Sequence, residues 1–307
     1  MGTATQCRPY SGLNDAELTV GAALRGRPHR AQHELTMNAD ATINIGSTHA
    51  ICQDYVVARN GYVILSDGCS SSPDTDIGAR LLVKALDQRL TNASEIEELH
   101  QQAARTALDW ANILGLPAQS VDATLLSAHV IGDELIVACS GDGVIILESQ
   151  SGVLDVYAVS SPSGYPFYPS YAHQPERLAE LVAHNRCTKQ IKHGERVTTS
   201  DALTIAFKLN VAEYKYAAIA SDGVNSFFHT QPATNGKRLE PLALPDVLTE
   251  FWSFKNSHGA FVERRMKRFK KDTQPKGWQH ADDLAIGVIH LGEDHVRQRA
   301  QNVLDER

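Results

Sequence analysis

Three apolar runs in this chain of 307 residues end in an aspartate followed by a glycine. The aspartates are Asp67, Asp142 and Asp222, and a fourth acidic pair, Asp282 and Asp283, opens another apolar run. A carboxylate at the end of a buried strand is held rigidly at the rim of a core. Several such rims brought together make an oxygen-rich cage suited to Mg²⁺ or Mn²⁺. The pattern therefore predicts a fold in which distant strand ends meet around cations.

The same dipeptide has a second interpretation, because Asp-Gly between apolar runs is also a strong hairpin signal. After Gly143 a strand-like segment follows at once, so Asp142 is equally well explained as a turn residue or as a metal ligand. After Gly68 the chain enters a helical pattern, so the turn interpretation fails for Asp67. Asp222 is intermediate. We therefore favour metal binding for Asp67 and Asp222 and leave both alternatives open for Asp142.

Composition limits the classes of function. Hydrophobic residues make up 42% of the chain, which is ample for a sizeable core. The net charge of -7 argues against a nucleic-acid-binding surface, and with it against a metal-dependent nuclease. No apolar stretch reaches the ~20 residues that a membrane helix needs, and no signal-peptide pattern is visible. The five cysteines form no C-x-x-C pair. We expect a cytoplasmic protein without membrane or nucleic-acid partners.

Hydrophobic periodicity predicts an α+β domain. Short turns such as those at Gly61 and Gly132 join successive strands, which makes the strands antiparallel. Two antiparallel β-sheets packed face to face and flanked by helices would use all the predicted elements. The expected strands are residues 41–45, 54–58, 62–66, 123–131, 135–140, 144–148, 153–159, 202–209, 216–221 and 284–291. Two helices are expected to start after the caps Asp74 and Ser94, and three more are expected at residues 176–184, 245–254 and 260–271.

Three stretches lie outside this regular pattern. Residues 1–36 show no sustained period and are interpreted as an N-terminal extension to a domain of residues 37–294, with residues 295–307 as a tail. Residues 160–196 are rich in Pro, Ser and aromatic side chains, and a loop this long is usually functional or disordered. Residues 263–271 are strongly basic. We interpret them mainly as a solvated helix face, with docking of an acidic partner or the substrate as the alternative.

From about residue 45 to residue 291 the chain resembles the metal-dependent Ser/Thr protein phosphatases of type 2C (PPM type), as a divergent, bacterial-like member. The resemblance implies an αββα sandwich and makes residues 160–196 a flap-like insertion beside the active site. It depends on several motifs in a fixed order. These are residues 46–54, which end in Gln53-Asp54, then Ser66-Asp67-Gly68, residues 122–126 (Asp-Ala-Thr-Leu-Leu), Ser140-Gly141-Asp142-Gly143, Ala220-Ser221-Asp222-Gly223 and Ala281-Asp282-Asp283-Leu284.

The resemblance implies hydrolysis of phosphate monoesters on phosphoproteins through a water that bridges two Mg²⁺ or Mn²⁺ ions, without a phosphoenzyme. Asp67 would bridge the two ions, and Asp54 would orient the water. The implied partners are a phosphorylated protein substrate and a cognate Ser/Thr kinase in a signalling pathway. The implied catalytic residues are Asp54, Asp67, Asp222 and Asp282, and the implied metal ligands are Asp67, the Gly68 carbonyl, Asp142 (for a weaker third ion), Asp222 and Asp282.

Two departures from the family pattern concern the substrate. Five residues before Asp54 the family has a phosphate-binding Arg, whereas this chain has His49, and Cys69 follows Gly68 where the family has His or Met. A His matches the bidentate, permanent charge of Arg only partly and only when protonated. His49 is the candidate substrate-binding residue, with a structural hydrogen-bonding role as the alternative. A catalytically weak regulatory module that binds a phosphorylated or kinase partner is the alternative function.

Overall fold

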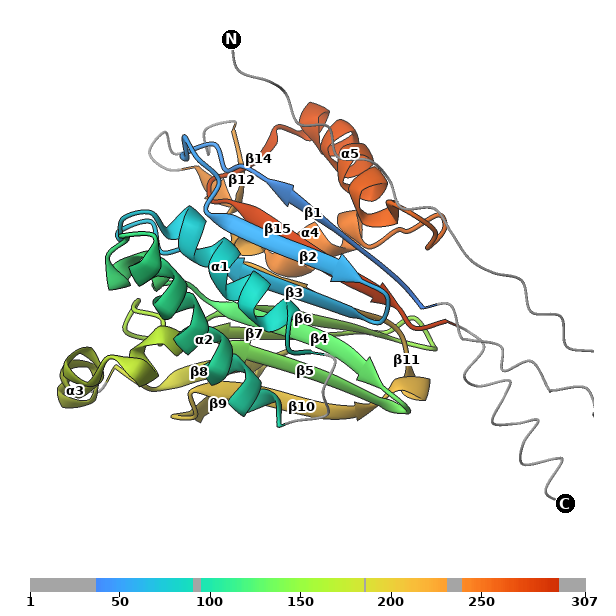
Figure 1. The fold of residues 1–307 in the computed structure, drawn as a ribbon. Helices are drawn as coiled ribbons and strands as arrows, with labels where there is room; N and C mark the ends of the chain where they lie inside the picture. Colours follow the sequence, from blue (N-terminus) through green and yellow to red (C-terminus); the bar gives the residue numbers. More distant parts are fainter. Residues whose placement is uncertain (1–36, 91–94, 185, 231–238, 293–307) are drawn as a thin grey trace, which may run out of the picture. The chain divides into compact units, whose positions relative to one another are not determined.

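The structure is a computed structural model that describes residues 37–90, 95–184, 186–230 and 239–292. These residues form two large antiparallel sheets, a small third sheet and five α-helices (Figure 1). The predicted α+β class with two packed sheets is therefore confirmed. The five-stranded sheet has the order β10-β5-β4-β3-β2. Its strands are β2 (Asp54–Arg59), β3 (Tyr62–Asp67), β4 (Leu125–Ile131), β5 (Glu134–Ser140) and β10 (Thr204–Asn210).

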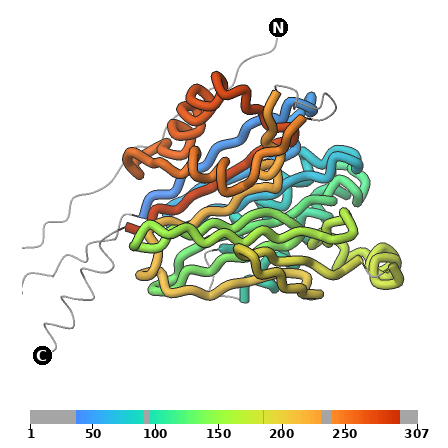
Figure 2. Tube along the Cα trace, turned by 180° about the vertical axis from the view of Figure 1, so that it is seen from behind, coloured from blue at the N-terminus to red at the C-terminus, as the bar shows by residue number. Residues whose placement is uncertain are grey.

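The seven-stranded sheet has the order β1-β15-β11-β6-β7-β8-β9, and a separate three-stranded sheet has the order β13-β12-β14. Figure 2 shows the larger sheet from behind. The strands are β1 (Asn38–Asn44), β6 (Gly143–Ser149), β7 (Leu154–Ser160), β8 (Lys189–His193), β9 (Arg196–Ser200), β11 (Tyr214–Ala220), β12 (Phe227–His229), β13 (Glu240–Pro241), β14 (Trp278–His280) and β15 (Leu284–His290).

Helices cover the outer faces of both sheets. Figure 1 shows α1 and α2 over the five-stranded sheet, and α3 at one end of the sheets. The α-helices are α1 (Thr75–Asp87), α2 (Ile96–Ile113), α3 (Pro175–Ala183), α4 (Leu244–Phe251) and α5 (Phe261–Thr273), and the short 3-10 helices are η1 (Ala118–Val121), η2 (Pro169–His173), η3 (Val211–Glu213), η4 (Asp222–Asn225) and η5 (Gln274–Lys276).

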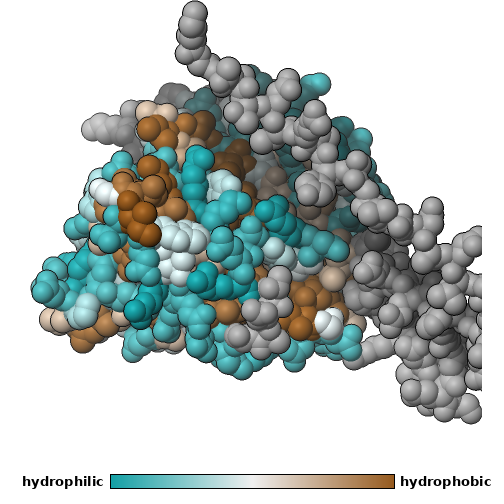
Figure 3. Space-filling view, viewed as in Figure 1, coloured by the Kyte–Doolittle hydropathy of each residue, from teal (hydrophilic) through white to brown (hydrophobic). Residues whose placement is uncertain are grey.

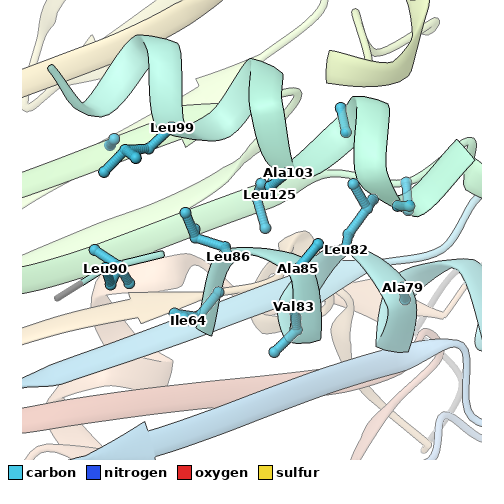
Figure 4. Close-up of a cluster of buried hydrophobic side chains, with 14 of the residues drawn as sticks. Ile64, Ala79, Leu82, Val83, Ala85, Leu86, Leu90, Leu99, Ala103 and Leu125 are labelled. Atoms are coloured by element: carbon cyan, nitrogen blue, oxygen red, sulfur yellow. The ribbon is translucent and has the colours of Figure 1, made fainter. Parts of the chain in front are cut away.

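Strand alternation builds three apolar layers, because successive side chains of a strand point to opposite faces. In β3, Ile64 packs under α1 and α2, while Val63 and Leu65 face the opposite sheet. In β11, Ile219 points into the layer between the sheets and Ala218 toward α4 and α5. Figure 4 shows the outer layer between α1, α2 and the five-stranded sheet. The sandwich thus holds both large sheets in a fixed relation, which aligns their strand ends.

A buried histidine belongs to the layer under α2. His100 lies on α2, with Nδ1 2.9 Å from Ser140 Oγ and Nε2 2.9 Å from Ser127 Oγ. Burial lowers the pKa of His100 to about 3 and that of His129 to about 4. Both rings therefore stay neutral in the folded protein over a pH range in which the unfolded chain would bind protons.

We expect acid to destabilise the fold through these rings. As the pH falls below 6.5, the ordinary pKa, each ring contributes a loss of about 1.4 kcal/mol per pH unit until its folded pKa is reached. Urea unfolding of the wild type and of His100→Gln at pH 7.5 and pH 5.0 measures the difference. The variant, whose amide does not titrate, should lose about 2 kcal/mol less than the wild type over this range. Equal losses would contradict the assignment.

Most predicted elements are present with ends shifted by a few residues, but the structure differs from the expectations in three details. The segment between residues 140 and 144, for which a hairpin turn was one of two alternatives, is not a hairpin: β5 and β6 belong to different sheets. The irregular stretch after residue 160 contains the hairpin β8–β9, which extends the larger sheet. Asp74 does precede α1, but its side chain makes no capping hydrogen bond. The predicted cap Ser94, the 1–36 extension and the 295–307 tail lie outside the described residues, and the domain boundaries stay predictions.

The surface, the helices and the cysteines were also considered in the sequence. Figure 3 shows that the face carrying α1 and α2 is largely hydrophilic, with separate hydrophobic patches. Within the described ranges, none of the helices combines the length and the apolar character needed to span a membrane. Cys52, Cys69, Cys139 and Cys187 are free thiols.

Candidate active site

A pocket of about 390 Å³ opens where the ends of both large sheets meet. Asp67 reaches it from the end of β3 in the five-stranded sheet. Asp222 reaches it from the end of β11, and Asp282 from the segment before β15, both in the seven-stranded sheet. Asp142 completes the acidic wall. The structure thus brings together the four carboxylates that the sequence places at the ends of apolar runs.

Asp54 and Asp67 face each other across the β2–β3 pair. Like charges directly opposite each other on neighbouring strands are destabilising unless something neutralises them. After burial, the charges of Asp54 and Asp222 both raise the pKa of Asp67. Ser221 Oγ donates to Asp54 Oδ2 at 2.6 Å and thereby fixes the orientation of that carboxyl. Asp54 is therefore a rigid member of the cluster, buried just behind the residues that line the pocket.

Asp222 and Asp282 are positioned by a close contact between two loops. A Cβ atom on Gly223 would lie 1.8 Å from the backbone oxygen of Asp283, so only glycine fits there. Ser226 Oγ accepts a hydrogen bond from the backbone N–H of Asp282 at 3.1 Å. The Ser-Asp-Gly loop after β11 is thus packed directly on the Asp-Asp segment before β15.

Asp142 lies on the crossover between the sheets. The glycines on either side have φ values of +97° at Gly141 and +141° at Gly143, a backbone region that other residues rarely adopt. A Cβ on Gly143 would also lie 2.9 Å from the backbone oxygen of Ala220. The hairpin explanation of Asp142 is therefore wrong, and the crossover carries its side chain to the pocket. Its role as a ligand stays a prediction.

The aspartates repel one another in a buried setting. Burial raises the pKa of Asp54 to about 7 despite the hydrogen bond from Ser221. Burial and then the Asp222 carboxylate raise the pKa of Asp142 to about 7. Burial followed by the charge of Asp54 raises the pKa of Asp67 well above its usual range, and burial followed by Asp282 raises that of Asp222. Negative charge is thus accumulated at these four aspartates, and the raised pKa values reflect its cost.

This donor set fits divalent cations. The Oδ1 atoms of Asp54 and Asp222 are buried without a hydrogen-bond partner. In the described part of the chain, no Lys or Arg nitrogen lies within 4.0 Å of Asp54, Asp67, Asp142 or Asp222. Hard carboxylate oxygens are the ligands that Mg²⁺ and Mn²⁺ prefer.

The carboxylates are spread around the pocket and do not converge on one common point. Across the described residues, no group of three or more His, Cys, Asp or Glu side chains is arranged as a ready-made metal site. Mg²⁺ keeps several waters and is usually bound through one or two protein carboxylates, so a wide, hydrated arrangement suits it. Gly68 also lines the pocket, and a Cβ there would lie 2.7 Å from the backbone oxygen of Thr75.

His49 is held by the acidic pair. Its Nδ1 lies 2.8 Å from Asp283 Oδ2, and its Nε2 lies 3.3 Å from Asp282 Oδ1. Asp283 is buried and also accepts hydrogen bonds from the backbone N–H groups of Gly46 and Gln53, both at 2.7 Å. Burial lowers the pKa of His49, but the hydrogen bond to Asp283 and the nearby aspartates outweigh it, so the pKa is raised. His49 is not among the pocket-lining residues.

A second wall of the pocket was missed by sequence reasoning. Arg177 of α3 forms a bidentate pair with the buried Asp122, with Nη1–Oδ1 and Nη2–Oδ2 distances of 2.7 and 2.8 Å. Its guanidinium lies 4.4 Å from the centre of the Tyr171 ring. Tyr165 and Tyr168, from the 160–196 segment, also line the pocket, and the flap-like role of that segment stays a prediction. The only sequence signal was the aromatic density of that segment.

Comparisons with known proteins address the family and the fold. The profile of the protein phosphatase 2C family matches residues 46–269. The Mycobacterium tuberculosis serine/threonine phosphatase PstP/Ppp is 14% identical, with a TM-score of 0.50 over 83% of this chain and 99% of that chain. The PPM Ser-Thr phosphatase MsPP of Mycobacterium smegmatis, solved with cacodylate, is 17% identical, with a TM-score of 0.51 over 83% and 98%.

A third solved structure, described as a bacterial serine phosphatase, is 12% identical, with a TM-score of 0.51 over 84% of this chain and 99% of that chain. At such low identities these likenesses establish the shared fold. A search of curated protein sequences found no match.

Proposed function

This chain belongs to the protein phosphatase 2C family, and from that membership and the site we propose that it is a metal-dependent phosphatase acting on phosphoserine and phosphothreonine of proteins. The observation that carries the proposal is the convergence of uncompensated carboxylates from both sheets on one pocket. A purely structural cluster would be expected to include a paired Lys or Arg, because buried carboxylates are costly without one.

The proposed ligands of the cations are Asp67, Asp222 and Asp282, with the Gly68 carbonyl and Asp142 as further donors. When bound, divalent ions lower the pKa of water and neutralise charge on the phosphoryl group. The residues themselves position the reactants. Asp54, fixed by Ser221, has Oδ1 free to accept a proton from an attacking water and to orient it.

The cationic groups that could bind the substrate phosphate are already engaged by aspartates. The guanidinium of Arg177 is already occupied by Asp122, and His49 is tied to Asp282 and Asp283. This weak phosphate clamp is the observation that favours the alternative function, a catalytically weak regulatory module that binds a phosphorylated or kinase partner. Release of phosphate from p-nitrophenyl phosphate with Mn²⁺, and its loss with EDTA, separates the two functions. No release above the EDTA control would count against the enzyme.

We expect His49→Arg to strengthen substrate binding. An Arg offers a permanent, bidentate charge for phosphate, whereas the imidazole of His49 is charged only when protonated and cannot bind phosphate in a bidentate way. The Michaelis constant for a phosphothreonine peptide should fall severalfold in the variant, with kcat changed less. His49→Gln is the control, since it keeps a hydrogen bond to Asp283 without the charge. If His49→Arg leaves the Michaelis constant unchanged, His49 has a structural role.

A further inference from the structure

Beside the catalytic pocket lies a second groove, of about 480 Å³, between the end of α5 and the small sheet. Its floor is aromatic, formed by Phe227 and Phe269, with Trp278 at its side. Its rim carries two exposed lysines, Lys270 and Lys271, from the last turn of α5. The groove thus combines an apolar base with positive charge, which suits an anionic peptide segment.

The two lysines differ from most of the other basic residues of this region. Arg265 and Arg268 lie within 4.0 Å of Asp272, Lys267 is paired with Glu263, and Lys276 is paired with Glu250. By contrast, no carboxylate of the described residues lies within 4.0 Å of either groove lysine. Partial burial lowers the pKa of Lys270, as expected for a cation without a neutralising partner. An anion in the groove would supply that partner.

The groove is joined to the catalytic carboxylates by direct contacts. Its residue His280 donates from Nδ1–H to the backbone oxygen of Asp282 at 2.8 Å. Ser47, also on the groove, donates its backbone N–H to His280 O at 3.0 Å. Two residues farther along, His49 touches Asp282. Two residues of extended chain span at most about 7 Å, so the groove begins within a few peptide residues of the proposed reaction centre.

We propose that this groove binds an acidic segment of the phosphoprotein substrate, a few residues from the phosphorylated side chain. The proposal rests on the proposed phosphatase function and adds a preference for the substrate sequence. The acidic catalytic pocket by itself would repel such a segment, whereas Lys270 and Lys271 attract it and hold it to one side. The aromatic floor contributes contact area without requiring a particular sequence.

The test uses phosphothreonine peptides that differ in only three residues. These are all Glu or all Gln, and they lie on either the N-terminal or the C-terminal side of the phosphothreonine. The wild type should have a Michaelis constant at least about tenfold lower for the Glu peptide of one orientation, and this advantage should shrink in high salt. The double variant Lys270→Glu, Lys271→Glu should lose the advantage and keep the wild-type rate on p-nitrophenyl phosphate. Lys267→Glu is the matched control, because Lys267 lies on the same helix but is paired with Glu263. This variant should keep the advantage for the Glu peptide.

Any one of three kinetic outcomes would overturn the groove proposal: equal Michaelis constants for Glu and Gln peptides in both orientations, an advantage that survives in the double variant, or equal loss in the Lys267→Glu control. Anisotropy with the unphosphorylated Glu peptide measures binding without catalysis. Binding lost in the double variant while the Michaelis constants stay equal would assign the groove to a separate acidic protein and also overturn the proposal. Absence of p-nitrophenyl phosphate hydrolysis, with binding intact, would instead count against the phosphatase function.

Discussion

Asp222→Asn is expected to abolish Mn²⁺-dependent hydrolysis of p-nitrophenyl phosphate and of a phosphothreonine peptide. We expect a loss of roughly a thousandfold, since removing only an outer partner of a metal ligand already costs roughly 10- to 100-fold. Asn keeps the shape of the side chain but brings no charge to the cations. Steady-state rates over a range of Mn²⁺ concentrations measure the effect, and the exposed Asp109→Asn on α2 is the control.

The same variant should be more stable than the wild type when no metal is present. Burial and then Asp282 raise the pKa of Asp222 in the folded protein, so the ionised form disfavours folding. This penalty is absent below the usual pKa of 3.8 and grows as the pH rises through the folded value. In EDTA at pH 7.5 the melting temperature of Asp222→Asn should therefore exceed that of the wild type. Unchanged turnover, or a lower melting temperature in EDTA, would contradict the assignment.

Gly223→Ala is expected to misplace the catalytic carboxylates. Its Cβ would lie 1.8 Å from Asp283 O, so the loop bearing Asp222 must move away from the segment bearing Asp282. A displacement of about 1 Å at a reaction centre can cost about a hundredfold in rate. Overpacking of this kind also costs about 1 to 3 kcal/mol of stability. Rates and urea unfolding measure both effects.

The matched control is Gly194→Ala, in the turn between β8 and β9. That glycine has a φ of +58° and no atom within 4 Å of its ideal Cβ, so the variant carries backbone strain without a clash. Its stability should fall by about 1 kcal/mol while its rate stays unchanged. A fully active Gly223→Ala variant would show that the two loops need not be in contact for catalysis.

The acidic cluster could be predicted because its signal is local. An apolar run that ends in Asp places a carboxylate at a strand end whatever the rest of the fold does. At Asp67 the helical pattern after Gly68 already excluded a hairpin. Strands β3 and β11 were equally visible as continuous apolar runs, because they are covered on both faces.

The path of the chain at Asp142 could not be predicted, because a tight turn and a crossover between sheets use the same residues. Both need glycine at positive φ, as found at Gly141 and Gly143. Only the pairing partners differ: β5 pairs with β4 and β10, whereas β6 pairs with β7 and β11. Those partners are set by tertiary packing and leave no mark in the local pattern.

The β8–β9 hairpin was missed for a different reason. Lys189, in β8, is 1% exposed although Lys is rarely buried. Its Nζ donates to the backbone oxygens of Ala202 and Leu203 at 2.6 and 2.9 Å, and burial lowers its pKa to about 8. A buried lysine breaks the alternation by which strands are recognised. The pairing of Arg177 with Asp122 was likewise invisible, because the two residues are 55 positions apart.

The central claim is that Asp67, Asp222 and Asp282 bind divalent cations together. The most direct measurement is anomalous diffraction from a crystal of the whole chain grown with Mn²⁺. Two manganese peaks are expected in the pocket, with carboxylate oxygens of all three residues at coordination distance. A pocket that stays free of manganese at millimolar concentration, or manganese bound elsewhere with these carboxylates protonated or paired with one another, would contradict the claim.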